Sequence, residues 1–317
     1  MKKIYLAPLE GITDNTYRNK FKEFYGGCEK EFTPFLSPNS TKKFTTREFR
    51  EIDPEINDVT TTVPQLLTNN AECFLWAANR IAELGFHEIN FNLGCPSGTV
   101  VAKKKGSGLL FYPELLDRLL YEVFANLPSC PDGEPLSVSI KTRLGKNDPD
   151  EFEEVLEIFN KYPIAELTVH PRIQTDFYKE PVREKYFSYA LSHTDIPLVF
   201  NGDIKSVDDM RSIEESYPNI TAMMLGRGLI ANPELALQYK NSREPEAPDL
   251  ERLKAFHNEL LAEYTDLFSG DKPVLHRIKE LWVFWRELFP DSEKAIKQIQ
   301  KSKHLSEYKI AVHGLIN

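Results

Sequence analysis

The feature of this sequence that most constrains its fold is a regular alternation of strand-like and helix-like segments. Eight short apolar runs are separated by longer stretches with helical periodicity, and they cover residues 3–8, 31–36, 61–66, 87–93, 136–142, 165–170, 196–201 and 220–225. Strands that alternate with helices form parallel sheets, and eight such units close a (β/α)₈ (TIM) barrel. A doubly wound open sheet is the structural alternative. No Gly-x-Gly-x-x-Gly motif follows the first run, so we expect the barrel.

The stretches between the runs carry helix start and stop signals. Asp14 is a capping residue ahead of a helix that runs to about Phe24, and Gly85 ends a helix over residues 71–84. Further helices are predicted over residues 113–125, 150–162, 181–192 and 207–217. These helices would form the outer ring of the barrel.

The chain changes character after the eighth run. Residues 241–248 are rich in proline and charge, which is typical of a boundary, and everything after them reads as helix. We therefore predict a barrel domain over residues 1–243 and a smaller all-α domain over residues 248–317.

The helix expected over residues 274–289 has an apolar stripe with a basic row beside it. The stripe predicts a buried face and consists of Val274, Ile278, Leu281, Trp282, Trp285, Leu288 and Phe289. The basic row consists of Lys272, His276, Lys279 and Arg286. From Asp271 onward Lys and Arg outnumber Asp and Glu nine to six, although the whole chain has a net charge of -9. The basic row is either a solvated face or a contact surface for an anionic partner.

Polar residues and glycines collect at the carboxyl ends of the runs. In a barrel these ends converge on one rim, where such folds place their chemistry. The residues concerned are Pro8, Leu9, Glu10, Gln65, Asn92, Cys95, Lys141, Arg143, His170, Asn201, Gly202, Asp203, Gly226, Arg227 and Gly228. Core packing alone does not explain this coincidence.

Two glycine-bearing turns follow the seventh and eighth runs. Backbone amides freed by Gly202, Gly226 and Gly228, together with a short helix starting near Leu229, would cradle an anion, and Arg227 adds positive charge. The plainer interpretation is a pair of tight turns.

A single thiol lies on a stiff corner after the fourth run. In the segment Asn92-Leu-Gly-Cys-Pro96, Gly94 permits an unusual backbone angle and Pro96 fixes the next one. A buried, inert cysteine is the common alternative. The polar flanks of Cys95 favour a functional role instead, and Lys103, in the basic run Lys103–Lys105, gives a positive spot nearby.

Composition limits the partners and the compartment. A net charge of -9 argues against indiscriminate nucleic-acid binding, although a local basic face remains compatible with it. The four cysteines are scattered without metal-ligand spacing, so we expect a reducing cytoplasm and no metal. The sequence has no uninterrupted apolar run of about 18 residues, so we expect no membrane span.

The combined motifs resemble the flavin-dependent tRNA-dihydrouridine synthase family. The matching segments are residues 7–14, Gln65, residues 92–96, 106–110, 141–145, 170–172, 201–203 and 226–228, and residues 277–281 resemble the helical domain of the family. The segments occur in the family's order and cover the barrel. Pro171 replaces the glycine that is usual between the histidine and the arginine of that motif.

The resemblance implies a site at the barrel mouth that holds FMN, with NADPH or NADH as the reductant and tRNA as the partner of a monomeric enzyme. Residues implied to bind FMN are Pro8, Leu9, Glu10, Gln65, Lys141, His170, Asn201, Gly202, Asp203, Gly226 and Arg227. Asn92 and Arg143 would face the uridine, and Cys95 would be the catalytic acid. Contacts to the tRNA are expected from Lys103, Lys279 and Arg286.

Two other functions remain as alternatives. A barrel resembling dihydroorotate dehydrogenase would use FMN on a free pyrimidine and would not need a basic helical appendage. A barrel that only binds RNA would purify colourless and would not take up FMN.

Overall fold

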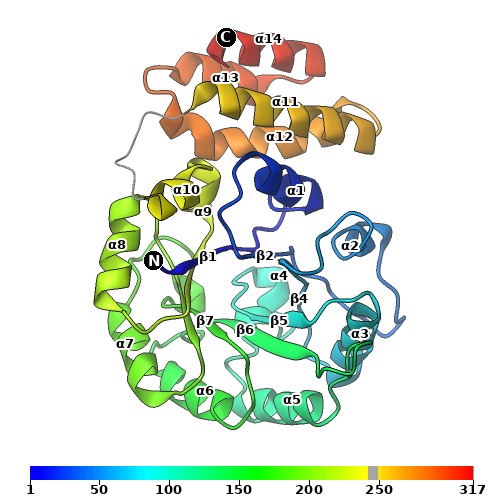
Figure 1. Ribbon diagram of the computed structural model, residues 1–317, viewed down its shortest axis with the longest axis vertical. Helices are drawn as coiled ribbons and strands as arrows, with labels where there is room; N and C mark the ends of the chain where they lie inside the picture. The colour runs from blue at the N-terminus through cyan, green and yellow to red at the C-terminus, as the bar shows by residue number, and fades with distance from the viewer. Residues whose placement is uncertain (242–248, 317) are drawn as a thin grey trace.

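The computed structural model describes residues 1–241 and 249–316, and its centre is a closed ring of parallel strands surrounded by helices (Figure 1). The strands are β1 (Lys3–Leu6), β2 (Lys30–Phe32), β3 (Thr62–Val63), β4 (Gln65–Leu66), β5 (Glu88–Leu93), β6 (Ser137–Arg143), β7 (Leu167–His170), β8 (Leu198–Asn201) and β9 (Ala222–Leu225). Their order around the sheet is β3-β2-β1-β9-β8-β7-β6-β5-β4, and every pairing is parallel.

Pro64 explains why the strands are one more than the eight predicted. It divides the run over residues 61–66 into β3, which pairs with β2, and β4, which pairs with β5. Because the two ends of the sheet belong to one interrupted strand, the barrel is closed. The Pro64 carbonyl still accepts a hydrogen bond from the Asn90 amide at 2.8 Å. The predicted (β/α)₈ barrel is confirmed.

The outer helices follow local capping signals. The Asp14 carboxylate accepts a bond from the Tyr17 amide at 3.0 Å, which starts α1 as predicted, and Asn70 starts α3 in the same way. The longer outer helices are α1 (Asn15–Phe24), α3 (Ala71–Glu83), α5 (Pro113–Ala125), α6 (Glu151–Phe159), α7 (Glu184–His193) and α8 (Val207–Ser216). Shorter ones are α2 (Thr46–Arg50), α4 (Gly98–Val101), α9 (Arg227–Ala231) and α10 (Leu235–Lys240), and α2 and α4 were not predicted from the sequence.

The interior of the barrel is divided into an apolar and a polar half. Side chains from β1, β2, β3, β8 and β9 form an apolar cluster around Tyr5, Phe32 and Met224. On β4, β5 and β6 the inward positions carry amides, a hydroxyl and a carboxylate instead. The main hydrophobic core lies between the outer faces of the strands and the helices.

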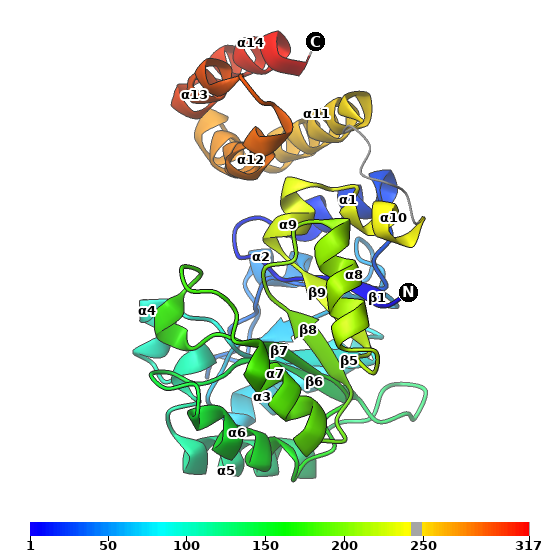
Figure 2. The ribbon, with the colours of Figure 1, turned by 90° about the vertical axis from the view of Figure 1, so that its left-hand side faces the viewer.

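The carboxyl-terminal helices lie against one side of the barrel, above α1 and α9 (Figures 1 and 2). They are α11 (Leu250–Leu267), α12 (Asp271–Trp285), a 3₁₀ turn (Arg286–Leu288), α13 (Glu293–Lys301) and α14 (Leu305–Ile316). The predicted apolar stripe on α12 is buried, and Phe256 of α11 packs edge-on against Tyr17 of α1. Trp285 donates to the Ile230 carbonyl at 3.0 Å. The boundary predicted between residues 243 and 248 lies outside the described residues, so the division into two domains stays a prediction.

A buried polar chain holds α11, α12 and α14 together. The Trp282 indole donates to the Tyr308 hydroxyl at 2.8 Å, and that hydroxyl lies 2.6 Å from His257 Nε2. Since the hydroxyl accepts from the indole, its own proton goes to Nε2, and the ring proton is on Nδ1, 3.0 Å from Asn258 Oδ1. Burial lowers the pKa of His257 to about 4, so the imidazole is neutral in the folded chain.

This neutral histidine predicts a loss of stability in acid. The unfolded chain takes up a proton near pH 6.5 and the folded chain only near pH 4. Stability from this group is therefore complete above pH 6.5 and falls by about 3 kcal/mol as the pH drops through that window. Denaturant unfolding at neutral pH and at about pH 4.5 would measure the loss. The His257→Asn variant should lose less than the wild type over the same interval, and equal losses would contradict this account.

Candidate active site

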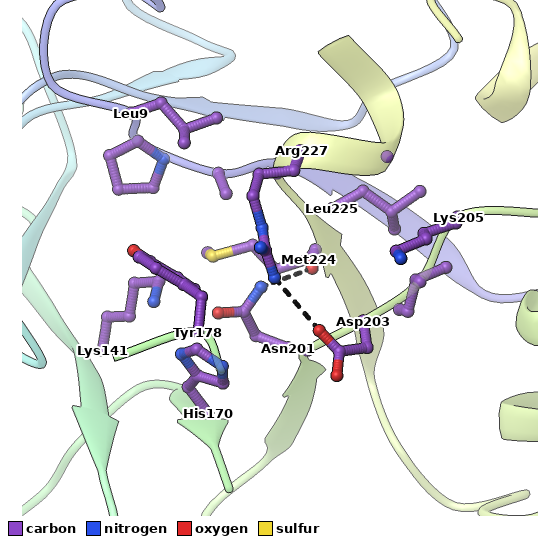
Figure 3. A pocket seen from close by; sticks show the side chains of 16 residues that line it. Leu9, Lys141, His170, Tyr178, Asn201, Asp203, Lys205, Met224, Leu225 and Arg227 are labelled. Atoms are coloured by element: carbon purple, nitrogen blue, oxygen red, sulfur yellow. Dashed lines mark hydrogen bonds and ion pairs between the residues drawn. The ribbon is translucent and has the colours of Figure 1, made fainter. Parts of the chain in front are cut away.

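A pocket opens at the carboxyl ends of β1, β6, β7, β8 and β9 (Figure 3). Every residue predicted to bind the flavin lines this pocket except Glu10 and Gln65. Those lining it are Pro8, Leu9, Lys141, His170, Asn201, Gly202, Asp203, Gly226 and Arg227. The fold thus brings together side chains that are up to about two hundred residues apart in the chain, as expected for the rim of a barrel.

The turns after β8 and β9 form the polar end of the pocket. The Asn201 amide donates to the Met224 carbonyl at 2.7 Å, which joins the two strand tips. A Cβ at Gly228 would lie 2.0 Å from the Ile204 carbonyl oxygen, so only glycine permits this approach. Helix α9 begins here, and the N–H groups of a first helical turn have no intrahelical partner. With Arg227 and Lys205 also lining the pocket, this end is suited to a phosphate group.

Asp203 organises the arginines beside these turns. Its carboxylate pairs with the buried guanidinium of Arg172 and accepts from Arg227 Nη2 at 3.1 Å (Figure 3). Arg172 Nη1 also lies 3.1 Å from His170 Nε2. Asp203 therefore contributes by fixing positive charge, because a carboxylate facing a phosphate directly would repel it.

Lys141 is a half-buried cation at the other end of the pocket. Burial lowers its pKa to about 7, and the neighbouring Arg143 lowers it further, whereas Cys95 acts in the opposite direction. No carboxylate among the described residues forms an ion pair with it. A desolvated ammonium without a counter-charge is suited to a bound anion or an electron-rich ring.

His170 is held neutral in the floor of the pocket. Burial lowers its pKa well below the ordinary value, and the cations Arg143, Lys141, Arg172 and Arg227 add to the effect. Because Arg172 donates to Nε2, the ring proton is on Nδ1. His170 can therefore donate one hydrogen bond and carries no charge.

The Cys95 corner is fixed from both sides by hydrogen bonds. Asn92 Oδ1 accepts from the amides of Gly94 and Cys95 at 3.1 and 2.9 Å, and Ser107 Oγ donates to the Cys95 carbonyl at 2.8 Å. Gly106 has φ +56°, and a Cβ there would lie 2.8 Å from the Cys95 carbonyl oxygen. Burial raises the pKa of the Cys95 thiol, so the sulfur carries its proton at neutral pH.

Arg143 ties this corner to the loop that follows β7. The side chain is 1% exposed and donates to the carbonyls of Gly94, Ile173 and Phe177 at 3.1, 2.9 and 2.8 Å. In this structure it is a framework residue, and its predicted contact with the uridine stays a prediction. Asn92, predicted for the same role, is likewise bonded to the Cys95 corner.

The other predicted residues lie elsewhere. Glu10 is exposed and pairs with Arg47 at 2.5 Å, and Gln65 is buried in the barrel between Asn90 and Asn92. Lys103 is exposed beyond α4. On the helical side the two predicted tRNA contacts differ: Lys279 is half-buried and donates to the Ser302 carbonyl at 2.8 Å, whereas Arg286 is exposed in a groove that Arg227 and Lys205 also line. The predicted basic row is therefore not one continuous exposed face.

Several pocket residues were missed in the sequence. Tyr178 lies in the long loop after β7, with its ring stacked near His170 and the Arg227 guanidinium 4.5 Å from the ring centroid. No strand-end position marked it, since its place depends on how the loop folds back. Lys205 and Met224 were also missed.

Pro171 is compatible with the backbone beside the pocket. The Arg172 amide donates to the His170 carbonyl at 2.7 Å, which is the short turn that the fixed φ angle of proline favours. The substitution of the usual glycine therefore leaves Arg172 turned toward Asp203.

One group of possible metal ligands lies outside the pocket. Within the described ranges His87, Cys130 and Asp132 place their ligand atoms within 4.8 Å of one another. They lie before the first residues of β5 and β6, at the opposite end of the barrel from the pocket.

Fold and pocket together define an enzyme of the (β/α)₈ barrel class with its site on the carboxyl-terminal rim. The fold is similar to that of histamine dehydrogenase from Rhizobium sp. 4-9, with a TM-score of 0.53 and 14% identity, over 76% of this chain and 46% of that one. It is equally similar to that of morphinone reductase, with a TM-score of 0.53 and 11% identity, over 79% of this chain and 89% of that one.

The sequence narrows this class to a family. A model described as dihydrouridine synthase (Dus) matches residues 5–314, and the chain belongs to the dihydrouridine synthase family. Membership makes the chain a flavin-dependent oxidoreductase. The resemblance inferred from the motifs is thereby confirmed.

Curated relatives align over most of the chain. A tRNA-dihydrouridine(16) synthase of Vibrio vulnificus is 29% identical over 94% of this chain and 92% of its own length. Proteins of the same name from Pseudomonas putida and Ralstonia nicotianae are 32% identical over 76% of this chain (74% of the relative) and 30% identical over 96% (94% of the relative). No helix in the described part of the chain is long and apolar enough to cross a membrane.

Proposed function

We propose that this protein is a tRNA-dihydrouridine synthase that holds FMN in the rim pocket and reduces the 5,6-double bond of a D-loop uridine, with NADPH or NADH as the electron source. One observation carries the proposal: a pocket with a phosphate-suited end and an unpaired Lys141 lies beside a rigidly held, protonated thiol. The names of the relatives support position 16 of the tRNA as the substrate uridine.

The pocket residues fit the two ends of FMN. The turns at Gly202 and Gly226, with Arg227, would hold the phosphate. Lys141 and His170 would face the isoalloxazine, and Pro8 and Leu9 would lie along it. When bound, the flavin supplies hydride for the uracil ring after reduction by a nicotinamide.

Cys95 would supply the second hydrogen. Saturating the double bond adds a hydride at C6 and a proton at C5, so an acid must face the ring. A thiol whose pKa is raised by burial is protonated at neutral pH and can donate without a further proton source. The hydrogen bonds from Asn92 and Ser107 fix the backbone that carries it.

Binding of tRNA would use local positive charge, because the chain as a whole is acidic. The substrate base must leave its stack to reach the pocket, which costs a few kcal/mol. Phosphate contacts near the rim would offset this cost, and Arg286, Lys205 and Lys103 are the exposed or rim-lining cations available there.

Mapping of dihydrouridine in tRNA tests the proposal directly. Cells that lack the gene should lose dihydrouridine at position 16 and keep it at other positions, and the purified yellow protein should restore it. Turnover of free orotate or uracil without tRNA would favour the free-pyrimidine alternative. A protein that stays colourless after addition of FMN would favour RNA binding without catalysis.

Charge reversal at Arg286 should separate tRNA binding from flavin binding. Arg286→Glu is expected to weaken tRNA binding about tenfold and to lower the slope of log affinity against log salt concentration by about 1, with unchanged flavin content. Filter binding at several salt concentrations measures both. Arg211→Glu, on the outer helix α8, is the matched control and should behave as wild type. An unchanged slope for Arg286→Glu would remove this residue from the tRNA contact.

A further inference from the structure

A continuous chain of hydrogen bonds crosses the polar half of the barrel. It starts at the Cys95 corner on the rim and ends near the opposite mouth. Its links are Cys95 N to Asn92 Oδ1 at 2.9 Å, Asn92 Nδ2 to Gln65 Oε1 at 2.7 Å, Gln65 Nε2 to Asn90 Oδ1 at 2.8 Å, Asn90 Nδ2 to Ser139 Oγ at 2.9 Å, and Ser139 Oγ to Glu88 Oε1 at 2.7 Å. Gln65 and Asn90 are fully buried, and Ser139 is 1% exposed.

Both ends of the chain fix its direction. At the rim, the amides of Gly94 and Cys95 can only donate, so Asn92 must turn its oxygen toward them. At the other end, Glu88 is held as a carboxylate by Lys30, whose ammonium lies 2.7 Å from its second oxygen. A carboxylate only accepts, so the Ser139 hydroxyl must donate to it and accept from Asn90. The amides of Asn90, Gln65 and Asn92 therefore have one compatible orientation each.

We propose that Ser139 and Glu88 are positioning residues that set the amide orientation of Gln65 from the far end of the barrel. The proposal rests on the function proposed above, in which Gln65 bonds the edge of FMN. After its two links in the chain, Gln65 has one N–H and one lone pair left. The chain presents these two groups in a fixed order, and a reversed amide would present them in the opposite order.

The same chain also reaches the proton donor. A reversed Gln65 would set an N–H against the Asn92 amide N–H, and its oxygen would oppose the oxygen of Asn90. Asn92 could then satisfy Gln65 only by turning its own oxygen away from Gly94 and Cys95. Orientation of the group that recognises the flavin and stability of the Cys95 corner are thus linked through Ser139 and Glu88.

Binding of FMN to the apoprotein tests this role without relying on activity. The Ser139→Ala variant removes the acceptor for Asn90 and should raise the FMN dissociation constant about tenfold, as measured by quenching of flavin fluorescence. Ser139→Thr keeps the hydroxyl and should stay within about twofold of wild type. Ser137→Ala, an exposed serine on the same strand, is the matched control and should bind as wild type. Glu88→Gln, which offers Ser139 an N–H as well as an oxygen, should also weaken binding.

A double variant distinguishes positioning from general damage. If Ser139 acts through Gln65, Ser139→Ala should cause no further loss in a Gln65→Leu background. An equal loss in both backgrounds would overturn the proposal, as would wild-type affinity in both Ser139→Ala and Glu88→Gln. Should Ser139→Ala fail to fold, the Glu88→Gln variant with and without Gln65→Leu gives the same decision. A wild-type apoprotein that takes up no FMN would instead refute the proposed function.

Discussion

The Cys95→Ala variant is expected to purify with its flavin, to oxidise NADPH slowly, and to form dihydrouridine in tRNA at least about a hundredfold more slowly than wild type. Loss of a positioned general acid commonly costs between 10² and 10⁴ in rate. The backbone of the corner is held by Asn92 and Ser107, neither of which bonds the thiol, so the fold of the loop should survive. Single-turnover oxidation of the reduced enzyme by tRNA would measure the rate.

Cys73→Ala provides the matched control for this prediction. Cys73 is a buried thiol on α3, remote from the pocket lining, and its removal should leave dihydrouridine formation near the wild-type rate. Dihydrouridine formation by Cys95→Ala at the wild-type rate would show that another group donates the proton. Loss of flavin from Cys95→Ala would show instead that the corner supports the cofactor.

The Arg18→Met variant should lose about 3–5 kcal/mol of unfolding free energy. Arg18 is 1% exposed and bonds Glu51 at 2.6 Å, Asn57 at 2.7 Å and the Thr13 carbonyl at 3.0 Å. Its removal leaves the Glu51 carboxylate buried without a counter-charge. Burial already raises the pKa of Glu51, and Arg18 is the main influence that opposes this rise. Chemical unfolding followed by tryptophan fluorescence would measure the change.

A second substitution should recover much of this loss. Arg18→Met/Glu51→Leu removes both charges, and replacement of a buried pair by apolar side chains is often close to neutral. Lys20→Met is the control on the same helix, because its ion pairs reach solvent and such pairs contribute little. If the double variant were as unstable as Arg18→Met, packing around Arg18 would be responsible and the buried charge would not.

The barrel could be predicted because its signals are local. Each strand is a short apolar run, and signals such as Asp14 and Asn70 mark helix starts within a few residues. Pro64 was visible in the sequence, but its division of one strand depends on pairing with two different neighbours. Helix α2 escaped notice because five residues are too few for a periodic pattern.

The candidate site could be predicted only where residues lie at strand ends. Lys141 and His170 reach the pocket through strand geometry, which the sequence pattern encodes. Tyr178 reaches it through the path of a long loop, and Lys279 loses its expected exposure because α13 packs beside it. The direction of the amide chain through Gln65 also requires three strands in register, which no single segment contains.

The bond from Trp285 to the Ile230 carbonyl has a consequence for protein engineering. It fastens α12 to the end of α9, the short helix whose beginning faces the phosphate-suited turn. A truncated barrel without residues 249–316 would leave that helix unsupported, so the two parts do not form a modular pair. Grafting the carboxyl-terminal helices onto another scaffold would require α9 to be transferred with them.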